Sequence, residues 1–149
     1  TEKNMKRDNS SYTVTSPDLM LTESGMSVLI SCNDQEVVDE IKLLIEQFIN
    51  ATSIVFYVQN KPTTDASLAW LYHATMSSDL CIIDADNCAW IDILTTALNA
   101  KGLVIYYSPK NKKRDALKVL HASAKYPIIH SREDLKEYIT AEFNADRNY

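Results

Sequence analysis

The feature that most constrains this chain is an alternation of short apolar runs with longer amphipathic segments. The apolar runs cover residues 26–32, 54–58, 80–84, 103–107 and 126–129. Runs that lack polar alternation are typical of strands covered on both faces of a sheet. Strands joined by helices of about ten or more residues predict right-handed crossovers and a parallel sheet.

The segments between the runs repeat apolar residues with the spacing of a helix that buries one face. The predicted helix starts carry side chains that cap N-termini. These caps are Asn33 (with Glu36 as a capping box), Thr64 or Asp65, Asn87 and Ser131 (with Asp134). In the helix that starts near residue 64, the expected core contacts are Leu68, Ala69, Leu71 and Tyr72.

These elements predict a three-layer, doubly wound α/β fold of the flavodoxin-like kind. Its sheet is expected to have five mostly parallel strands in the order 2-1-3-4-5, formed by residues 26–149 as a single domain. Residues 1–25 form a polar N-terminal arm. Within the arm, residues 11–15 alternate between polar and apolar and predict a short extended piece, suited to an added edge strand.

Composition excludes several classes of protein. The net charge of −5 gives no general affinity for nucleic acid or for acidic membranes. The longest apolar runs are too short to span a bilayer, and the polar N-terminus lacks the apolar region of a signal peptide. We therefore expect no membrane association and a cytoplasmic protein, in the host cytoplasm if the chain is viral.

Glycine and cysteine argue against common kinds of chemistry. Neither Gly25 nor Gly102, the only two glycines, follows a strand and opens a helix, so no phosphate-binding turn can be written. Three cysteines are present without C-x-x-C spacing, and Cys32 and Cys81 lie within predicted buried strands. We expect reduced core thiols and no nucleotide cofactor.

In such sheets, ligands bind beyond the carboxyl ends of the strands, where the strand order reverses. Asp34 and Asp84 would face each other there, and two carboxylates could hold Mg²⁺. Capping of a helix explains Asp34 equally well, and loop hydrogen bonding or solvation explains Asp84 and Asp86. The same edge would also receive side chains from the other strands, namely Asn60, Lys61, Ser108, Lys110, His130 and Ser131.

A basic loop and an acidic helix give the chain opposed charges. The loop contains Lys110, Lys112, Lys113 and Arg114. The acidic helix carries Asp34, Glu36, Asp39, Glu40 and Glu46. Each is most often a solvated face, but together they favour oriented contact with a partner or a second copy. Of the two tryptophans, Trp70 and Trp90, we expect one in the core and one at an interface.

The stretches SVLISCNDQEVVDEIKLLIEQF, SDLCIIDADN, VIYYS and DALKVL resemble the receiver domains of bacterial response regulators. In that family, acidic residues after the first strand bind Mg²⁺ and an Asp ending the third strand is phosphorylated. The residues that match these positions and the hydroxyl position after the fourth strand are Asn33, Asp34, Asp84 and Ser108. His130 and Ser131 depart from the Lys that the fifth strand should deliver. The resemblance therefore implies a degenerate receiver.

The segment SSDLCIIDADNCAWIDILTTALNAKGLVIYYSP also looks like the core of nucleoside 2-deoxyribosyltransferase-like domains. In those domains a helix between two such strands carries a nucleophilic Glu. Here the corresponding helix has Asp92 as its only carboxylate. This resemblance covers about a quarter of the chain, and function does not follow from fold alone.

Together these features favour a non-catalytic protein-interaction or assembly domain, either regulatory or a virus-type accessory or structural component. Its partner would be another protein or a second copy, engaged in part through the N-terminal arm, and its binding residues would include the basic loop and Trp90. Two alternatives stay open. One is a phospho-switch or a nucleoside- or nucleotide-processing enzyme centred on Asp84, supported by Asp34, Ser108 and Lys110. The other is nucleic-acid binding through residues 110–114, although this loop lacks aromatics for stacking.

Overall fold

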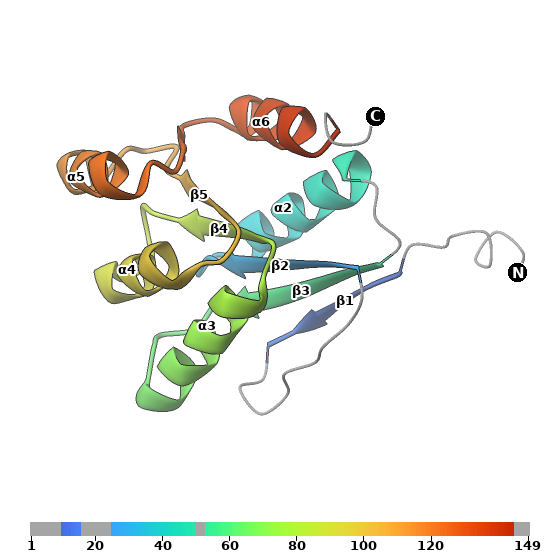
Figure 1. Cartoon of the computed structure of the whole chain (residues 1–149), viewed down its shortest axis with the longest axis horizontal. Helices are drawn as coiled ribbons and strands as arrows, with labels where there is room; N and C mark the ends of the chain where they lie inside the picture. The colour runs from blue at the N-terminus through green and yellow to red at the C-terminus, as the bar shows by residue number, and fades with distance from the viewer. Residues whose placement is uncertain (1–9, 16–24, 50–52, 145–149) are drawn as a thin grey trace, which may run out of the picture.

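A computed structural model describes residues 10–15, 25–49 and 53–144, in which six strands and five helices follow one another (Figure 1). The strands are β1 (Ser10–Val14), β2 (Met26–Ser31), β3 (Ser53–Gln59), β4 (Leu80–Asp84), β5 (Leu103–Tyr107) and β6 (Ile128–Ile129). The helices are α2 (Gln35–Phe48), α3 (Asp65–Ser77), α4 (Trp90–Asn99), α5 (Arg114–Ala124) and α6 (Arg132–Asn144). Among the described helices, none is long and apolar enough to cross a membrane.

The strands form one sheet in the order β1-β3-β2-β4-β5-β6, and every described pairing is parallel. The five strands expected from the apolar runs keep the predicted flavodoxin-like order within it, which confirms the doubly wound α/β class. The expectation of five strands falls one short, because the arm supplies β1. This strand pairs with β3 at the edge of the sheet, with Ser10 opposite Ser53 and Val14 opposite Tyr57.

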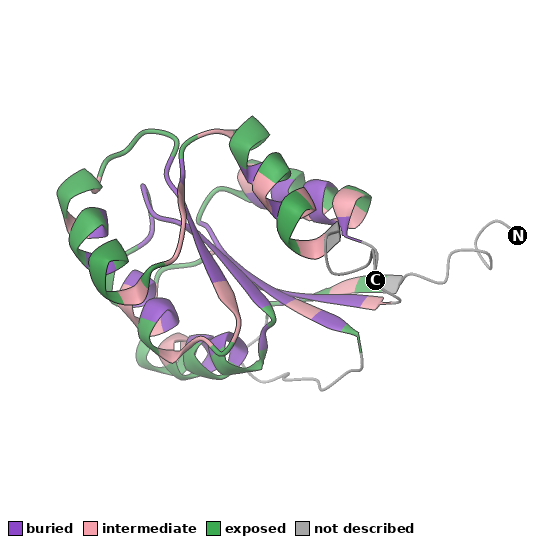
Figure 2. Ribbon diagram, turned by 45° about the horizontal axis from the view of Figure 1, so that its top comes forward, coloured by how far each residue is buried: buried purple, intermediate pink, exposed green. Residues whose placement is uncertain are grey.

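Two layers of helices cover the sheet, and each has its own apolar core. On one face, α2 and α6 pack on side chains such as Val28, Ile30 and Ile82. On the other face, α3, α4 and α5 pack on alternate residues of the same strands, among them Leu29 and Ile83. Figure 2 shows the buried strands between helices whose outer sides are exposed. This double covering explains why the strands lack polar alternation.

Side chains on both faces attach β1 to the rest of the sheet. Val14 is buried and Tyr12 packs beside it in the core under α3, α4 and α5. On the opposite face, Ser11 donates a hydrogen bond from its hydroxyl to Glu46 of α2, and Lys42 donates from Nζ to Thr13 Oγ1 at 2.7 Å. Polar bonds on one face and apolar burial on the other account for the alternating sequence of this strand.

Each of the two glycines lies immediately before a strand, Gly25 before β2 and Gly102 before β5, and not in a binding loop. Gly25 has φ +112°, a conformation that side chains rarely adopt, and a Cβ there would lie 2.2 Å from Ser53 Oγ. At Gly102 a Cβ would lie 2.3 Å from the carbonyl oxygen of Asp79. Both glycines therefore allow close backbone packing where β2 and β5 begin.

Helix starts follow the predicted capping chemistry in part. Thr64 caps α3 in a reciprocal box with Ser67, and Ser131 Oγ accepts a hydrogen bond from the Asp134 N–H. The cap of α2 is Asp34 rather than Asn33, since Asp34 Oδ1 accepts from the Glu36 N–H at 3.0 Å. The prediction that Asn87 caps the next helix is wrong. That helix, α4, begins at Trp90, and its N-cap Ala89 makes no side-chain hydrogen bond.

Candidate functional site

The strand order reverses between β2 and β4, because the chain moves from β2 to β3 on one side and returns to β4 on the other. Polar residues follow the carboxyl ends of these two strands and of β5. In a doubly wound sheet this edge is the usual place for a ligand.

Asp84 ends β4 and is buried, and its carboxylate is fully occupied by its own turn. Oδ1 accepts the N–H groups of Asp86 and Asn87 at 3.1 and 3.3 Å. Oδ2 accepts the Asn87 side-chain amide at 2.9 Å, and the Cys32 thiol lies 3.4 Å from the same oxygen. Asp84 thus holds the β4–α4 turn and joins it to the end of β2. This bonding also explains why Asn87 does not cap α4.

Asp86, two residues further on, holds the loop after β5. Its Oδ1 accepts from Ser108 Oγ at 2.7 Å and from the Lys112 N–H at 3.0 Å, while Oδ2 accepts from the Lys110 N–H at 2.8 Å. Burial alone would raise the pKa of Asp86, but these hydrogen bonds outweigh burial and hold the pKa below its ordinary value. Loop hydrogen bonding was one of the two explanations that the sequence offered for Asp86, but nothing in the sequence indicated that the partner would be the loop after β5.

The basic loop is divided between structural and solvent-facing groups. Lys113 directs its ammonium group to the carbonyl oxygens of Ala85 and Asp86, both at 3.0 Å. Lys110 and Lys112 contribute backbone N–H groups to Asp86, whereas their side chains, like that of Arg114, are exposed. Three cations of the predicted binding loop therefore face solvent, and the fourth secures the β4–α4 turn.

The thiols near this edge are unsuited to nucleophilic attack. Burial raises the pKa of Cys32 and of Cys88 to about 12, and Cys81, deeper in β4, behaves in the same way. Cys88 donates its S–H to the carbonyl oxygen of Ser31 at 3.1 Å. Since the thiolate is the reactive form, these cysteines serve as small core residues.

The open part of the edge is a shallow polar hollow of about 560 Å³ lined by Asn33, Asp34, Gln35 and Asn87. The two carboxylates that the sequence placed together do not both face this hollow. Asp34 lines it and caps α2, whereas Asp84 is enclosed by its own turn. Within the described ranges, no three His, Cys, Asp or Glu side chains gather in an arrangement that could hold a metal ion.

The remaining predicted residues are spread along the edge. His130 follows β6, and its Nδ1 lies 2.8 Å from the carbonyl oxygen of Ser108. Asn60 donates from Nδ2 to Gln35 Oε1 at 2.7 Å. Asp92, the only carboxylate of α4, is buried with both oxygens 2.7 Å from the Thr63 hydroxyl, a hydrogen bond that joins α4 to the β3–α3 loop. These contacts are all between neighbouring elements of the fold.

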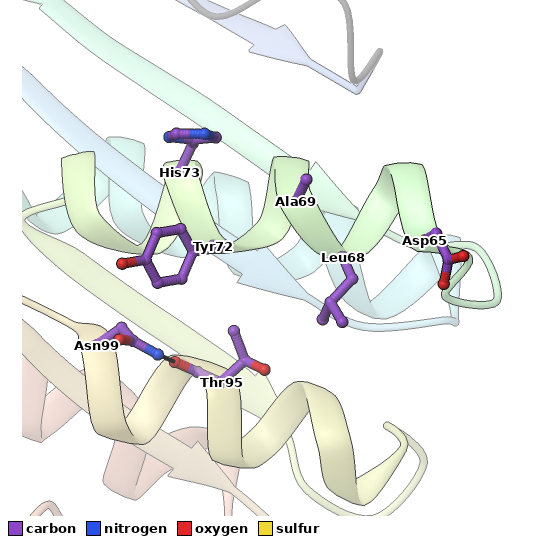
Figure 3. Close-up of a pocket in the computed structure, with 7 residues that line it drawn as sticks. All are labelled: Asp65, Leu68, Ala69, Tyr72, His73, Thr95 and Asn99. Carbon is purple, nitrogen blue, oxygen red and sulfur yellow. Dashed lines mark hydrogen bonds between the residues drawn. The ribbon is translucent and has the colours of Figure 1, made fainter.

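A mainly apolar groove lies between α3 and α4, away from the predicted edge. Figure 3 shows Leu68 and Tyr72 of α3 directed toward Thr95 and Asn99 of α4. The groove encloses about 410 Å³, and its other lining residues are Asp65, Ala69 and His73. The expectation that Ala69 and Tyr72 lie in the core is wrong, since both are exposed, whereas Leu71 is buried as predicted.

Large apolar side chains are exposed on both helices that form the groove. Tyr72 and Met76, one turn apart on α3, are 41% and 45% exposed, and Leu98 on α4 is 71% exposed. Leu98 is three residues from Thr95 and therefore shares its side of the helix. Trp70 is buried, as expected for the core tryptophan, whereas Trp90 and Ile91 at the start of α4 are exposed. An interface role for Trp90 stays a prediction.

Comparison with protein-family models and with curated proteins finds no match to this chain. The strand order alone therefore classifies the chain, as a parallel α/β sheet of the flavodoxin-like kind.

Proposed function

We propose that this chain is a protein-binding domain whose partner lays an apolar helix face into the groove between α3 and α4. The observation that carries the proposal is a groove lined by apolar groups such as Leu68 and Tyr72, with Met76 and Leu98 exposed on the same two helices. Large apolar patches on a protein surface mark interaction sites, and a groove between two helices is the usual receptor for an amphipathic helix.

The carboxyl edge of the sheet supports this choice over catalysis. The carboxylate oxygens of Asp84 and Asp86 accept hydrogen bonds from the turns around them. Burial raises the pKa of the neighbouring Cys32 and Cys88 thiols to about 12. A general base or nucleophile needs a free oxygen or a thiolate within reach of a substrate. The carboxylates described at this edge are instead hydrogen-bonded to neighbouring turns and loops of the protein.

The test places a photo-crosslinking residue at position 98 in the full chain, expressed in its own cells. A crosslinked protein is then purified, and its dissociation constant is measured by calorimetry. Leu98→Ser and Tyr72→Ser are each expected to raise this constant at least about tenfold, because they remove anchors of the contact. Val119→Ser is the matched control, since Val119 on α5 is also 71% exposed. An equal effect of the control, or unchanged affinity in both groove variants, would overturn the proposal.

The likeness to receiver domains supplies a second candidate, a phospho-switch at Asp84. Its supporting observation is that Asp84 ends β4 directly beside β2, the position of the phosphorylated residue in that family. Phosphorylation would have to displace the hydrogen bonds of Asn87 and Cys32 from this carboxylate. Incubation with Mg²⁺ and a small acyl phosphate tests it. A mass increase that disappears in Asp84→Asn would favour the switch, and an unchanged mass would leave the protein-binding proposal in place.

A further inference from the structure

The outer side of α2 is acidic around one exposed apolar residue. Glu36, Asp39 and Glu40 are exposed there, and Leu43, which lies on the same side at helical spacing, is 57% exposed. Lys42, the only cation of this helix, is turned away toward β1, where it bonds Thr13 and lies over the Phe56 ring. Arg132 of the neighbouring helix α6 forms an ion pair with Glu40 at 2.8 Å. We call Glu36, Asp39, Glu40 and Leu43 the acidic face.

The outer side of α5 has the opposite charge. Arg114, Lys118 and, just after the helix, Lys125 are exposed. Asp115 is the single acidic residue of this helix and lies 3.7 Å from Arg114. We call Arg114, Lys118 and Lys125 the basic face. The exposed ammonium groups of Lys110 and Lys112 in the preceding loop add to its charge.

The two faces lie on opposite layers of the molecule. The helix α2 packs in the core on one side of the sheet and α5 in the core on the other (Figure 2). One copy cannot therefore bring its own acidic and basic faces together. Pairing α2 with α2, or α5 with α5, across a two-fold axis would oppose like charges. Only a head-to-tail contact between copies places opposite charges together.

We propose that the chain associates with itself head to tail, with the acidic face of one copy against the basic face of the next. A head-to-tail contact whose rotation does not close generates a chain of subunits, and one that closes generates a ring. Each copy then uses both faces and keeps the groove between α3 and α4 free. The proposal goes beyond the binding function of that groove and depends on different residues.

Two charge-reversed proteins test the contact by sedimentation velocity at low salt. One carries Glu36→Lys with Asp39→Lys, and the other carries Arg114→Glu with Lys118→Glu. The unaltered chain is expected to form species larger than a dimer as its concentration rises. Each variant alone is expected to stay monomeric, with its self-association weakened at least about tenfold. Mixed together, the variants place opposite charges in both contacts, native in one and exchanged in the other. They are therefore expected to associate again, through a heterodimer to larger species.

The controls are Asp65→Lys and Lys61→Glu, which reverse exposed charges on and just before α3, away from both faces. They are expected to leave self-association unchanged, and circular dichroism checks that all variants are folded. Raising the salt to about 0.5 M should dissociate the assembly by screening the exposed charges. A monomeric unaltered chain at every concentration, or a mixture of the variants that gives no heterodimer, would overturn the head-to-tail contact. Neither result would affect the groove, which is tested with Leu98→Ser.

Discussion

At the scale of single residues, the buried carboxylates of Asp84 and Asp86 connect the ends of three strands. Asp84 joins the β4–α4 turn to the end of β2 through Cys32. Asp86 joins the same turn to the loop after β5 through Ser108, Lys110 and Lys112. Hydrogen bonds that involve an ionised group are roughly twice as strong as neutral ones, so such bonds hold these strand ends firmly together.

The substitution Asp86→Asn is expected to lower the free energy of unfolding by about 1–3 kcal/mol, because an amide N–H would face a donor of the Ser108–Lys112 loop. The pKa of Asp86 is lowered by folding, so its contribution is complete above the unfolded-state pKa. That contribution is lost as the pH falls through the lower folded-state pKa. Urea unfolding at a series of pH values should therefore show the difference between variant and parent shrinking in acid.

The control for this measurement is Asp115→Asn, whose side chain is 94% exposed. It is expected to change the free energy of unfolding little at any pH. A deficit of Asp86→Asn that stayed constant down to strongly acidic pH would contradict the assigned hydrogen bonds.

The sequence predicts where these residues lie and offers loop hydrogen bonding as one of their roles, but it does not identify the partners. Asp84 and Ser108 were expected at the carboxyl edge because each ends or follows an apolar run, and the structure places them there. The bonds between Asp86 and the loop after β5 span more than twenty residues of sequence. Such bonds depend on how β4 and β5 pair, which local spacing does not encode. The partners of Asp86 therefore emerge only in the folded chain.

At the scale of elements, β1 shows how an edge strand can be held without a long apolar run. One face of β1 buries Val14, and the other forms hydrogen bonds with Glu46 and Lys42 of α2. Val14→Ala is expected to lower the free energy of unfolding by about 1–3 kcal/mol through the lost apolar contact. Urea unfolding measures this change.

The neighbouring substitution Thr15→Ala is the control, because Thr15 is exposed just beyond the strand. It is expected to have little effect. If Val14→Ala unfolded at the same urea concentration as the parent, β1 would not contribute to the cooperative unit.

The buried side of α3 is the feature that the sequence predicts least well. Its apolar residues lie all around the helix, so periodicity does not show which side is buried. The structure buries Trp70, Leu71 and Ala74 and leaves Tyr72 and Met76 exposed. A helix with a single apolar side, such as α2, was predicted correctly because only one orientation buries that side.

At the scale of the whole molecule, protection from solvent should decrease from the centre of the sheet to its edges. The strands β2 and β4 have partners on both sides and helices over both faces, whereas β1 and β6 lie at the two edges. In native-state hydrogen exchange, the amides of β2 and β4 are expected to exchange slowest and those of β1 and β6 fastest among the strands. Mass spectrometry of exchanged peptides measures this order. Equal protection of β1 and β2 would show that the edge strand opens only when the whole sheet unfolds.

The position of β1 also has a consequence for how the chain is made. The strand β1 is synthesised before β2, yet it pairs with β3, which follows after the whole of α2. While the nascent chain emerges, β1 therefore has no neighbour to join, and contacts between such distant segments form slowly. The earliest of the described strands to leave the ribosome, like β2 after it, can therefore pair only once β3 has emerged.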